Sequence, residues 1–430
     1  YRQSERKEIY RSYAMQLVES GNAYYAFDTA HQLEQQRKNA EEKKETFSYG
    51  SATRMKLNNS LALSVDEVKE LLSKNVAYAI RLKVPENETI TFTDLIRGVV
   101  SFDSNLVDDK VLLKSDGMPT YHLAHIVDDY LMEITHAIRG EEWLPSAPAH
   151  ILIYRYLGLT AQMPHYAHLP LLLKPDGKGK LSKRDGDRLG FPVFPLEWKD
   201  PSTGEVSSGY RESGYYPEAF VNMLAMLGWN PGTAQEIFNM NELIAAFSLD
   251  HVHKAGARFD LEKTKWYNTQ WMLRQPNEAI AKRIKPMVAT RTGISADDVR
   301  LSDNYLTACV ALLKPRVQFE KEMPEKGIYL FKAPSEFDQT VISKKWKTEF
   351  ISFFKMLSDE FMTLQDWSSQ LAEQTFKTTA EKNNIKPGEV LQLFRVFVSG
   401  QAQGVDLFPM IQLLGKDEVI KRLETALKFV

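Results

Sequence analysis

Cysteine is almost absent from this chain of 430 residues, in which Cys309 is the single one. Without a second cysteine the chain cannot form an internal disulfide, which is typical of proteins in a reducing compartment. It also cannot build a zinc site from several thiolates. Cys309 lies in the apolar run 306–312, so we expect a small buried residue there.

Long apolar runs and an excess of one charge are also missing. No apolar stretch approaches the roughly 18 residues of a membrane-crossing helix, so no membrane partner is expected. The 54 basic and 56 acidic residues leave a formal net charge of −2. Overall charge therefore does not indicate a nucleic-acid partner, and any anion site has to come from local clustering.

Periodicity and turn signals divide the chain into predicted parts. Residues 4–20 and the charged stretch 32–45 are expected to be helical, the second as an exposed helix or solvated arm. Residues 76–84, 90–92 and 99–102 have the β-rich patterns of strands, which predicts an α+β region. Beyond about residue 236 the pattern is helical, and roughly the last 150 residues predict an all-α domain.

A strand, a polar turn and a helix are predicted in succession between residues 134 and 158. The strand ends near Arg139, and the turn contains Glu142. This succession is the unit of an open parallel sheet, which binds ligands at the carboxyl ends of its strands. Arg139 and Glu142 are therefore candidate binding residues.

The strongest local charge lies in segment 174–188, with six cationic and three acidic side chains. Two glycines, Gly177 and Gly179, give this loop mobility, and an apolar strand is predicted before it at 169–173. Lysine ammonium groups on such a loop can close over a polyphosphate and neutralise charge in a transition state. A solvated basic hairpin tip is the alternative interpretation.

Several motifs occur in a fixed order along the chain. They are DLIRG at 94–98, the segment 114–143, KLSKR at 180–184, GYYPEA at 214–219 and FDLEK at 259–263. KLSKR has the pattern of the second signature of class I aminoacyl-tRNA synthetases. Together the motifs resemble the bacterial-type glutamyl-tRNA synthetases of that class, and the resemblance spans nearly the whole chain.

The resemblance implies an incomplete Rossmann-type α/β catalytic domain with an α+β insertion that binds the tRNA acceptor end, followed by an all-α anticodon-binding domain. The implied parts are a remnant of the first catalytic half at 1–22, the connective-peptide insertion at 23–115, the second half of the catalytic domain with the KLSKR loop at 116–190, an insertion and stem-contact region at 191–275, and the helical anticodon-binding domain at 276–430. The role of the proline-rich insertion at 191–209 is not assigned.

The first class I signature, a histidine-x-glycine-histidine element, does not occur in this sequence. In the family it lies upstream of the helix that begins this chain, together with an arginine that completes the glutamate pocket. We therefore expect that the first section of the catalytic domain is missing and that this chain alone is inactive.

By resemblance the protein is a glutamate–tRNA ligase, which activates L-glutamate with ATP and transfers it to the 3′ end of tRNA(Glu). Tyr121, His125 and Arg139 match the glutamate pocket, with His125 where some relatives have asparagine. A guanidinium suits a carboxylate because it binds it in a bidentate fork. A structural ion pair of Arg139 with Asp128 or Asp129 is the alternative.

ATP, bound with Mg²⁺, is expected at a second group of residues. The resemblance implies catalytic roles for Lys180, Ser182, Lys183 and Arg184, and ATP contacts for Glu142, Trp143, Leu171, Leu172, Lys180 and Lys183. The two lysines would meet the phosphates, and the backbone of the two leucines would contact adenine. For Trp143, a plain core position is the alternative.

Some relatives hold zinc with cysteines in the insertion, but 23–115 contains none, so no zinc is expected. A cytoplasmic monomer is expected. Two alternatives stay open. A glutaminyl-type relative is disfavoured by the helical C-terminal pattern, since its bacterial members end in β-barrels. A non-catalytic tRNA-binding fragment is favoured by the missing signature and disfavoured by the intact loop 180–184.

Overall fold

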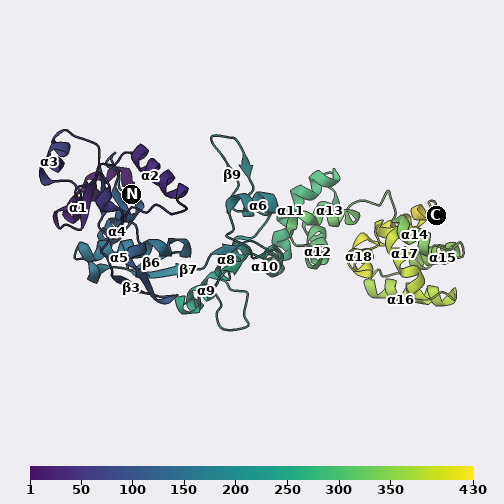
Figure 1. Ribbon diagram of the computed structural model, residues 1–430. Helices are drawn as coiled ribbons and strands as arrows, with labels where there is room; N and C mark the ends of the chain where they lie inside the picture. Colours follow the sequence, from purple (N-terminus) through teal and green to yellow (C-terminus); the bar gives the residue numbers. More distant parts are fainter. The chain divides into compact units, whose positions relative to one another are not determined.

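The computed structural model describes residues 1–430, apart from the side chains of Lys183, Arg184 and Asp187. The chain forms two compact units, each described by itself below (Figure 1). Unit 1 contains residues 1–181, 226–235 and 244–259, and unit 2 contains residues 182–225, 236–243 and 260–430.

Unit 1 is mixed α and β. Its helices are α1 (Lys7–Glu19), α2 (Ala30–Glu42), α3 (Val65–Ser73), α4 (Tyr121–Leu131) and α5 (Ala147–Tyr156). Its strands are β1 (Ala23–Ala26), β2 (Ala79–Leu82), β3 (Thr89–Asp94), β4 (Gly98–Asp103), β5 (Val111–Leu113), β6 (His136–Gly140), β7 (His165–Leu169), β8 (Leu172–Leu173) and β11 (Ala257–Arg258). The two N-terminal helices expected from periodicity are confirmed as α1 and α2, and no residue of α2 is fully buried.

The main sheet of unit 1 has the strand order β4-β3-β7-β6. β3 and β4 pair antiparallel, whereas β7 runs parallel to both β3 and β6. Helices α4 and α5 pack against each other, and Leu123, Ile126, Leu152 and Ile153 from these helices are fully buried. The parallel strand and following helix predicted at 134–158 are confirmed as β6 and α5, with a 3₁₀ segment, Glu141–Ser146, between them.

The strand predicted at 169–173 is wrong in its extent. β7 ends at Leu169, and Leu172–Leu173 form the separate strand β8, which pairs with β11. Pro170 explains the break, because a proline has no N–H for a ladder hydrogen bond. The strand predicted at 76–84 is shorter than expected, since only Ala79–Leu82 are paired as β2.

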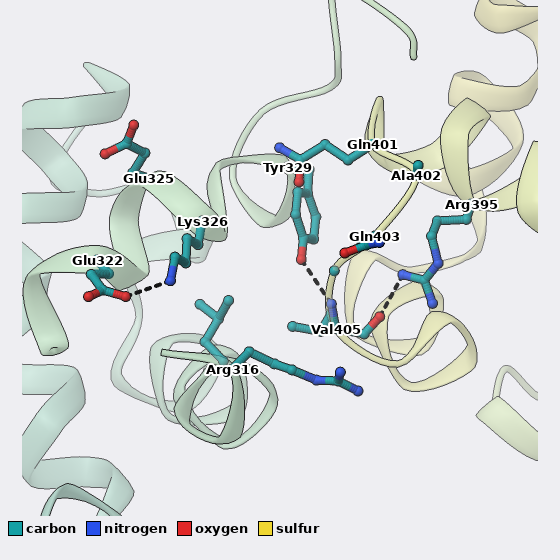
Figure 2. A pocket seen from close by; sticks show the side chains of 12 residues that line it. Arg316, Glu322, Glu325, Lys326, Tyr329, Arg395, Gln401, Ala402, Gln403 and Val405 are labelled. Atoms are coloured by element: carbon teal, nitrogen blue, oxygen red, sulfur yellow. Dashed lines mark hydrogen bonds and ion pairs between the residues drawn. The ribbon is translucent and has the colours of Figure 1, made fainter. Parts of the chain in front are cut away.

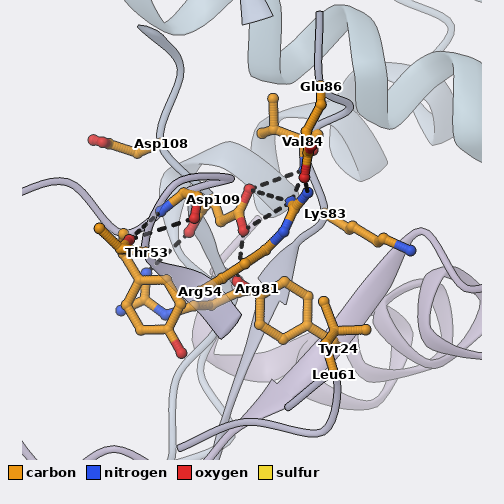
Figure 3. Close-up of polar contacts among 12 residues, drawn as sticks. Tyr24, Thr53, Arg54, Leu61, Arg81, Lys83, Val84, Glu86, Asp108 and Asp109 are labelled. Atoms are coloured by element: carbon orange, nitrogen blue, oxygen red, sulfur yellow. Dashed lines mark hydrogen bonds and ion pairs between the residues drawn. The ribbon is translucent and has the colours of Figure 1, made fainter. Parts of the chain in front are cut away.

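The three-stranded sheet β1-β2-β5 belongs to the N-terminal part of unit 1 and is held by a buried ion pair (Figure 3). Arg54 donates to the Val84 carbonyl at 2.8 Å, and its Nη1 lies 3.3 Å from Asp109 Oδ2. Tyr24 donates to the same carboxylate at 2.6 Å. Asp109 is completely buried, so its charge depends on these partners.

Unit 2 is mainly helical. Its elements are α6 (Lys183–Leu189), β9 (Trp198–Lys199), β10 (Val206–Ser207), α7 (Tyr210–Ser213), α8 (Pro217–Ala225), α10 (Leu261–Arg274), α11 (Asn277–Thr292), α12 (Asp303–Leu313), α13 (Met323–Lys326), α14 (Gln339–Lys345), α15 (Phe350–Thr363), α16 (Ser369–Lys382), α17 (Pro387–Ser399), α18 (Leu407–Leu414) and α19 (Lys416–Ala426). Helix α9 (Met240–Ala246) crosses the division between the units.

The all-α prediction for the C-terminal part is confirmed, because α10 to α19 follow β11 without a further strand among the described residues. One core of apolar side chains runs through these helices, with Phe353, Phe354 and Phe394 completely buried. Cys309 is buried in the same core, as its apolar surroundings predicted. Over the part of the chain that the structure describes, no helix combines the length and the apolar character needed to span a bilayer.

Candidate active site

Helix α4 presents three side chains of the candidate site on one face. Tyr121, His125 and Asp129 are spaced four residues apart, so they follow one another along the helix. The rings of Tyr121 and His125 stack with a centroid distance of 5.2 Å and an angle of 4°. His125 Nδ1 lies 3.1 Å from Asp129 Oδ2.

Arg139 extends from β6 into a group of histidines. Its Nε donates to His168 Nε2 at 3.0 Å, and its Nη1 lies 3.2 Å from His150 Nδ1 and 3.4 Å from His125 Nε2. Nη1 also donates to the Tyr121 hydroxyl at 3.3 Å. The three predicted glutamate-pocket residues are therefore brought together.

The second terminal nitrogen of Arg139, Nη2, is buried and has no hydrogen-bond partner among the described residues. The alternative of a structural ion pair is wrong in this structure. Asp128 instead accepts from Arg6 at 3.1 Å and from Tyr10 at 2.9 Å, and Asp129 lies against His125. The guanidinium of Arg139 therefore lacks a carboxylate partner in the described part of the chain.

His168 connects Arg139 to a buried carboxylate. Its Nδ1 lies 2.6 Å from Asp94 Oδ2, and neither side chain has exposed surface. Burial alone would raise the pKa of Asp94, but hydrogen bonds from His168 and from the backbone of Arg97 and Ile96 lower it below its usual value. Burial lowers the pKa of His168, against the opposing effect of Asp94.

His150 and His122 continue the group. His150 Nε2 lies 3.1 Å from His122 Nδ1. Burial, followed by the nearby His125 and Arg139, holds the pKa of His150 well below its usual value. Burial also lowers the pKa of His122 to about 4. Both imidazoles are therefore neutral near neutral pH.

The predicted nucleotide residues lie directly after β6. Glu142 forms an ion pair with Lys180, whose Nζ donates to Glu142 Oε1 at 2.6 Å. This hydrogen bond lowers the pKa of the Glu142 carboxyl group. A Cβ atom at Gly140 would overlap the Glu142 carboxylate as it lies here, so a larger residue would displace that carboxylate. Trp143 is 39% exposed and its ring centroid lies 4.4 Å from that of Tyr121. The alternative of a plain core position for Trp143 is therefore wrong.

Leu171 and Leu172 have much of their backbone hydrogen bonding satisfied internally. The Leu171 N–H donates to Glu141 at 3.2 Å, and its carbonyl accepts from Ala257 at 2.8 Å. The Leu172 carbonyl accepts from Leu181 at 2.7 Å. A base that used these groups would have to compete with the existing bonds.

The KLSKR segment joins β8 to α6. Ser182 is the N-cap of α6, and Asp185 accepts from its backbone N–H at 3.0 Å, as in a capping box, and from its hydroxyl at 2.6 Å. This contact supports a loop-shaping role for Ser182. The side chains of Lys183 and Arg184, both predicted to be catalytic, lie outside the described residues.

Three residues of this site have no predicted role from sequence reasoning: Asp94, His150 and His168. A sequence signal was available, because the chain contains only nine histidines. Four of them, His122, His125, His150 and His168, gather here from α4, α5 and β7. They are separated by up to 46 positions in the sequence, so only the fold unites them.

A second candidate site lies within unit 2, between the segments 313–329 and 395–405 (Figure 2). It is a cavity of about 840 Å³ whose lining includes Arg316 and Arg395. Tyr329 accepts from the Val405 N–H at 3.1 Å, and Arg395 donates to the Val405 carbonyl at 2.6 Å. These bonds fix the backbone of one wall.

Comparisons with known proteins agree with this fold and site. Residues 1–266 match the family described as tRNA synthetases class I (E and Q), catalytic domain, and residues 279–427 match an anticodon binding domain. The fold and the site thus define a class I aminoacyl-tRNA synthetase.

Individual relatives narrow the class. The glutamate–tRNA ligase of Christiangramia forsetii is 49% identical over 426 residues, which cover 99% of this chain and 83% of the relative. That of Cytophaga hutchinsonii is 48% identical over 429 residues, covering 99% and 82%. The chain belongs to the glutamate–tRNA ligase family.

A solved structure has the same fold. The crystal structure of a glutamate tRNA ligase from Elizabethkingia meningosepticum in complex with its amino acid matches with a TM-score of 0.91 and 43% identity, covering 100% of this chain and 84% of that one. These matches give no support to a glutaminyl-type relative or to a non-catalytic fragment. They also do not support the expectations that a first section is missing and that this chain alone is inactive.

Proposed function

We propose that this chain carries out the reaction of its family. L-glutamate is activated with ATP to glutamyl-adenylate and is then transferred to the 3′ end of tRNA(Glu). The observation that carries the proposal is the state of Arg139, whose Nη2 is buried without a partner among the described residues. A buried cation in this state favours an anionic ligand, and a carboxylate matches the guanidinium fork.

The proposed glutamate pocket consists of Tyr121, His125 and Arg139. The Tyr121 hydroxyl accepts from Arg139, so its own proton is free to donate to a carboxylate. Because Nη2 is buried, a carboxylate reaches it only when a neighbouring side chain moves. Tyr121 and Trp143, which are 40% and 39% exposed, are the side chains best placed to move.

The proposed ATP site uses residues that follow β6 and residues in and on either side of β8. It comprises Glu142, Trp143, Leu171, Leu172, Lys180, Ser182, Lys183 and Arg184. In the first step a glutamate carboxylate oxygen attacks the α-phosphorus and pyrophosphate leaves, so negative charge has to be stabilised. Lys180 can take part once its ammonium exchanges Glu142 for a phosphate, and we propose that Lys183 also neutralises charge on the phosphates.

Mg²⁺ would accompany ATP and supply further charge neutralisation at the phosphates. Among the described residues no three His, Cys, Asp or Glu side chains are grouped to hold a metal ion. Phosphate oxygens and water are therefore the ligands we propose for Mg²⁺. We propose that the insertion at 23–115 works without zinc, since Arg54 and Asp109 already join its segments.

The proposed tRNA contacts follow the division into parts expected from the sequence. The segments 1–22 and 116–190 would belong to the catalytic domain, and 191–275 would include the stem contact. The insertion at 23–115 would meet the acceptor end, and the helical part at 276–430 would meet the anticodon. The cavity of about 840 Å³ supports the last assignment, because its lining includes the cations of Arg316 and Arg395, which suit a nucleic-acid partner. We further propose that the protein acts as a cytoplasmic monomer.

Glutamylation of tRNA(Glu) by purified protein tests the function. We expect Arg139→Lys to raise the KM for glutamate and to lower kcat/KM about ten- to a hundredfold, because lysine keeps the charge but loses the fork. Arg155→Lys, at a surface pair with Glu88, is the matched control and should be neutral. Wild-type glutamate kinetics for Arg139→Lys would remove Arg139 from the pocket.

A further inference from the structure

All the side chains that accept hydrogen bonds from Arg139 are groups without a negative charge. They are three imidazole nitrogens and one phenol oxygen. An arginine whose guanidinium is partly buried is ordinarily balanced by a carboxylate. Here Asp94 and Asp129 are each one imidazole away, behind His168 and His125. The site therefore surrounds a cation with acceptors that do not neutralise it.

Arg139 fixes the tautomer of His168. A guanidinium can only donate, so His168 Nε2 has to accept with its lone pair. The proton of this imidazole then resides on Nδ1, where it is donated to Asp94. Asp94 remains a carboxylate, held by the backbone N–H groups of Ile96 and Arg97 at 3.0 and 2.9 Å.

The same reasoning applies to the other two imidazoles, although Nη1 has two protons for three acceptors, so His150, His125 and the Tyr121 hydroxyl share them. His150 Nδ1 accepts from Arg139, so its proton is on Nε2 and points to His122 Nδ1. His125 Nε2 accepts from Arg139, which leaves its proton on Nδ1 beside Asp129. A proton added to any of the three would remove an acceptor and place a second cation next to Arg139.

The protonation of these histidines also depends on the charged and titratable groups around them. The titratable and charged side chains that face the histidines from the surrounding elements are Asp94, Arg97, Lys110, Tyr121, His122, Asp129, Tyr154 and Tyr166. Burial, the largest effect in each case, lowers the pKa of His122, His150 and His168, and this supports neutral imidazoles.

We propose that His150 and the His168–Asp94 pair are positioning residues for glutamate recognition, which hold Arg139 through neutral acceptors so that a substrate carboxylate is its counterion. This inference rests on the proposed glutamate pocket. It also explains a preference for the acid over the amide. With the side-chain end of the substrate at Arg139, the carboxylate of glutamate brings the missing negative charge, whereas the side-chain amide of glutamine brings none and adds N–H donors that find no acceptor on the guanidinium.

Two substitutions at His168 separate positioning from plain packing. In glutamine the amide oxygen and nitrogen are spaced like the two ring nitrogens of histidine, so His168→Gln can accept from Arg139 and donate to Asp94. His168→Leu fills a similar volume but offers neither. We expect the Kd for L-glutamate, measured by calorimetry on the full chain, to rise about tenfold or more for His168→Leu and to stay within about threefold for His168→Gln.

His168→Leu leaves the Asp94 carboxylate buried without its imidazole partner, so this variant could fail to fold. The substitutions His150→Leu and His150→Gln therefore provide a second, independent test. His150→Leu removes an acceptor without exposing a buried carboxylate to that risk. Asp128→Asn is the control for stability alone, since Asp128 binds Arg6 and Tyr10 and does not contact the histidines. Its glutamate Kd should match that of the wild type, even if its unfolding temperature falls.

The outcomes are distinct. Weaker glutamate binding for both leucine variants, with recovery in both glutamine variants, supports the inference. Leucine variants that fold and bind glutamate like the wild type overturn it, and so do glutamine variants as weak as the leucine variants. If the wild type itself does not bind glutamate, the proposed function fails, and the inference fails with it.

Discussion

At the scale of single residues, Lys180 has a partner in this structure before any phosphate arrives. Its Nζ lies 2.6 Å from Glu142 Oε1, and both groups are partly exposed. An exposed ion pair of this kind contributes only about 0–1 kcal/mol. Exchange of Glu142 for a phosphate is therefore inexpensive, and the pair would keep Lys180 near the nucleotide without trapping it.

Lys183 is expected to act in the transition state of adenylate formation. Removal of one such charged donor typically costs about 2.7–4 kcal/mol, or about a hundred- to a thousandfold in rate. We expect this loss for Lys183→Ala in single-turnover adenylate formation, with nearly unchanged ATP binding. Lys178→Ala is the matched control from the same loop, and its rate should stay within about threefold.

A rate within threefold of the wild type for Lys183→Ala would contradict the assignment. An equal loss in both variants would point to the charge of the whole loop and not to Lys183. Saturating ATP and glutamate are required in both cases, so that binding does not limit the rate.

Sequence reasoning named one half of the proposed site and missed the other for a physical reason. Tyr121, His125 and Arg139 stand in a continuous motif, so a family pattern is enough to find them. His150 and His168 reach Arg139 only because α5 and β7 pack beside β6. Their contacts are tertiary, and no local pattern of residues encodes them.

At the scale of elements, local sequence signals predicted that a helix or strand exists better than they predicted where it begins and ends. Apolar spacing was sufficient for α1, and the β-rich pattern was sufficient for β6. The break between β7 and β8 depends on Pro170 and on pairing of β8 with the distant β11, which a local apolar run does not reveal. The run 169–173 therefore looked like one strand when it is parts of two.

The sheet β1-β2-β5 should depend on Arg54. Arg54→Met removes the only cation within ion-pair distance of Asp109 among the described residues and leaves the carboxylate buried. Breaking a buried pair from one side costs about 3–5 kcal/mol. We expect a loss of that size in urea unfolding, with faster amide exchange in β2.

Arg37→Met is the control for this measurement. Arg37 lies on the exposed helix α2, and its side chain is 62% exposed beside Glu34. Its substitution should change the free energy of unfolding by no more than about 0.5 kcal/mol. Equal stability losses in the two variants would show that Asp109 does not need Arg54.

At the scale of the whole molecule, the buried histidines couple stability to pH. The folded state lowers the pKa of His122 from 6.5 to about 4, and burial also lowers the pKa of His150 and His168. Between about pH 4 and 6.5 the unfolded chain therefore binds more protons than the folded one. Stability should be complete above pH 6.5 and should fall as the pH drops through this window.

We expect His122 alone to give a loss on the order of 2 kcal/mol between pH 7 and pH 5, since each unit of pKa shift corresponds to about 1.4 kcal/mol, and His150 and His168 add to this loss. Calorimetric unfolding at pH 7, 6 and 5 measures it. His122→Gln should flatten the profile, whereas His31→Gln, on the exposed face of α2, should leave it unchanged. A profile that is already flat in the wild type would contradict the neutral, buried state of these histidines.

The position of bound glutamate is the most direct test of the proposed site. A crystal structure of the protein with L-glutamate should place a substrate carboxylate about 3 Å from Arg139 Nη2, with the Tyr121 hydroxyl beside it. The His150 and His168 contacts to Arg139 should be unchanged. Glutamate bound elsewhere, with Nη2 still lacking a partner, would contradict the assignment of Arg139 as the residue that recognises the substrate.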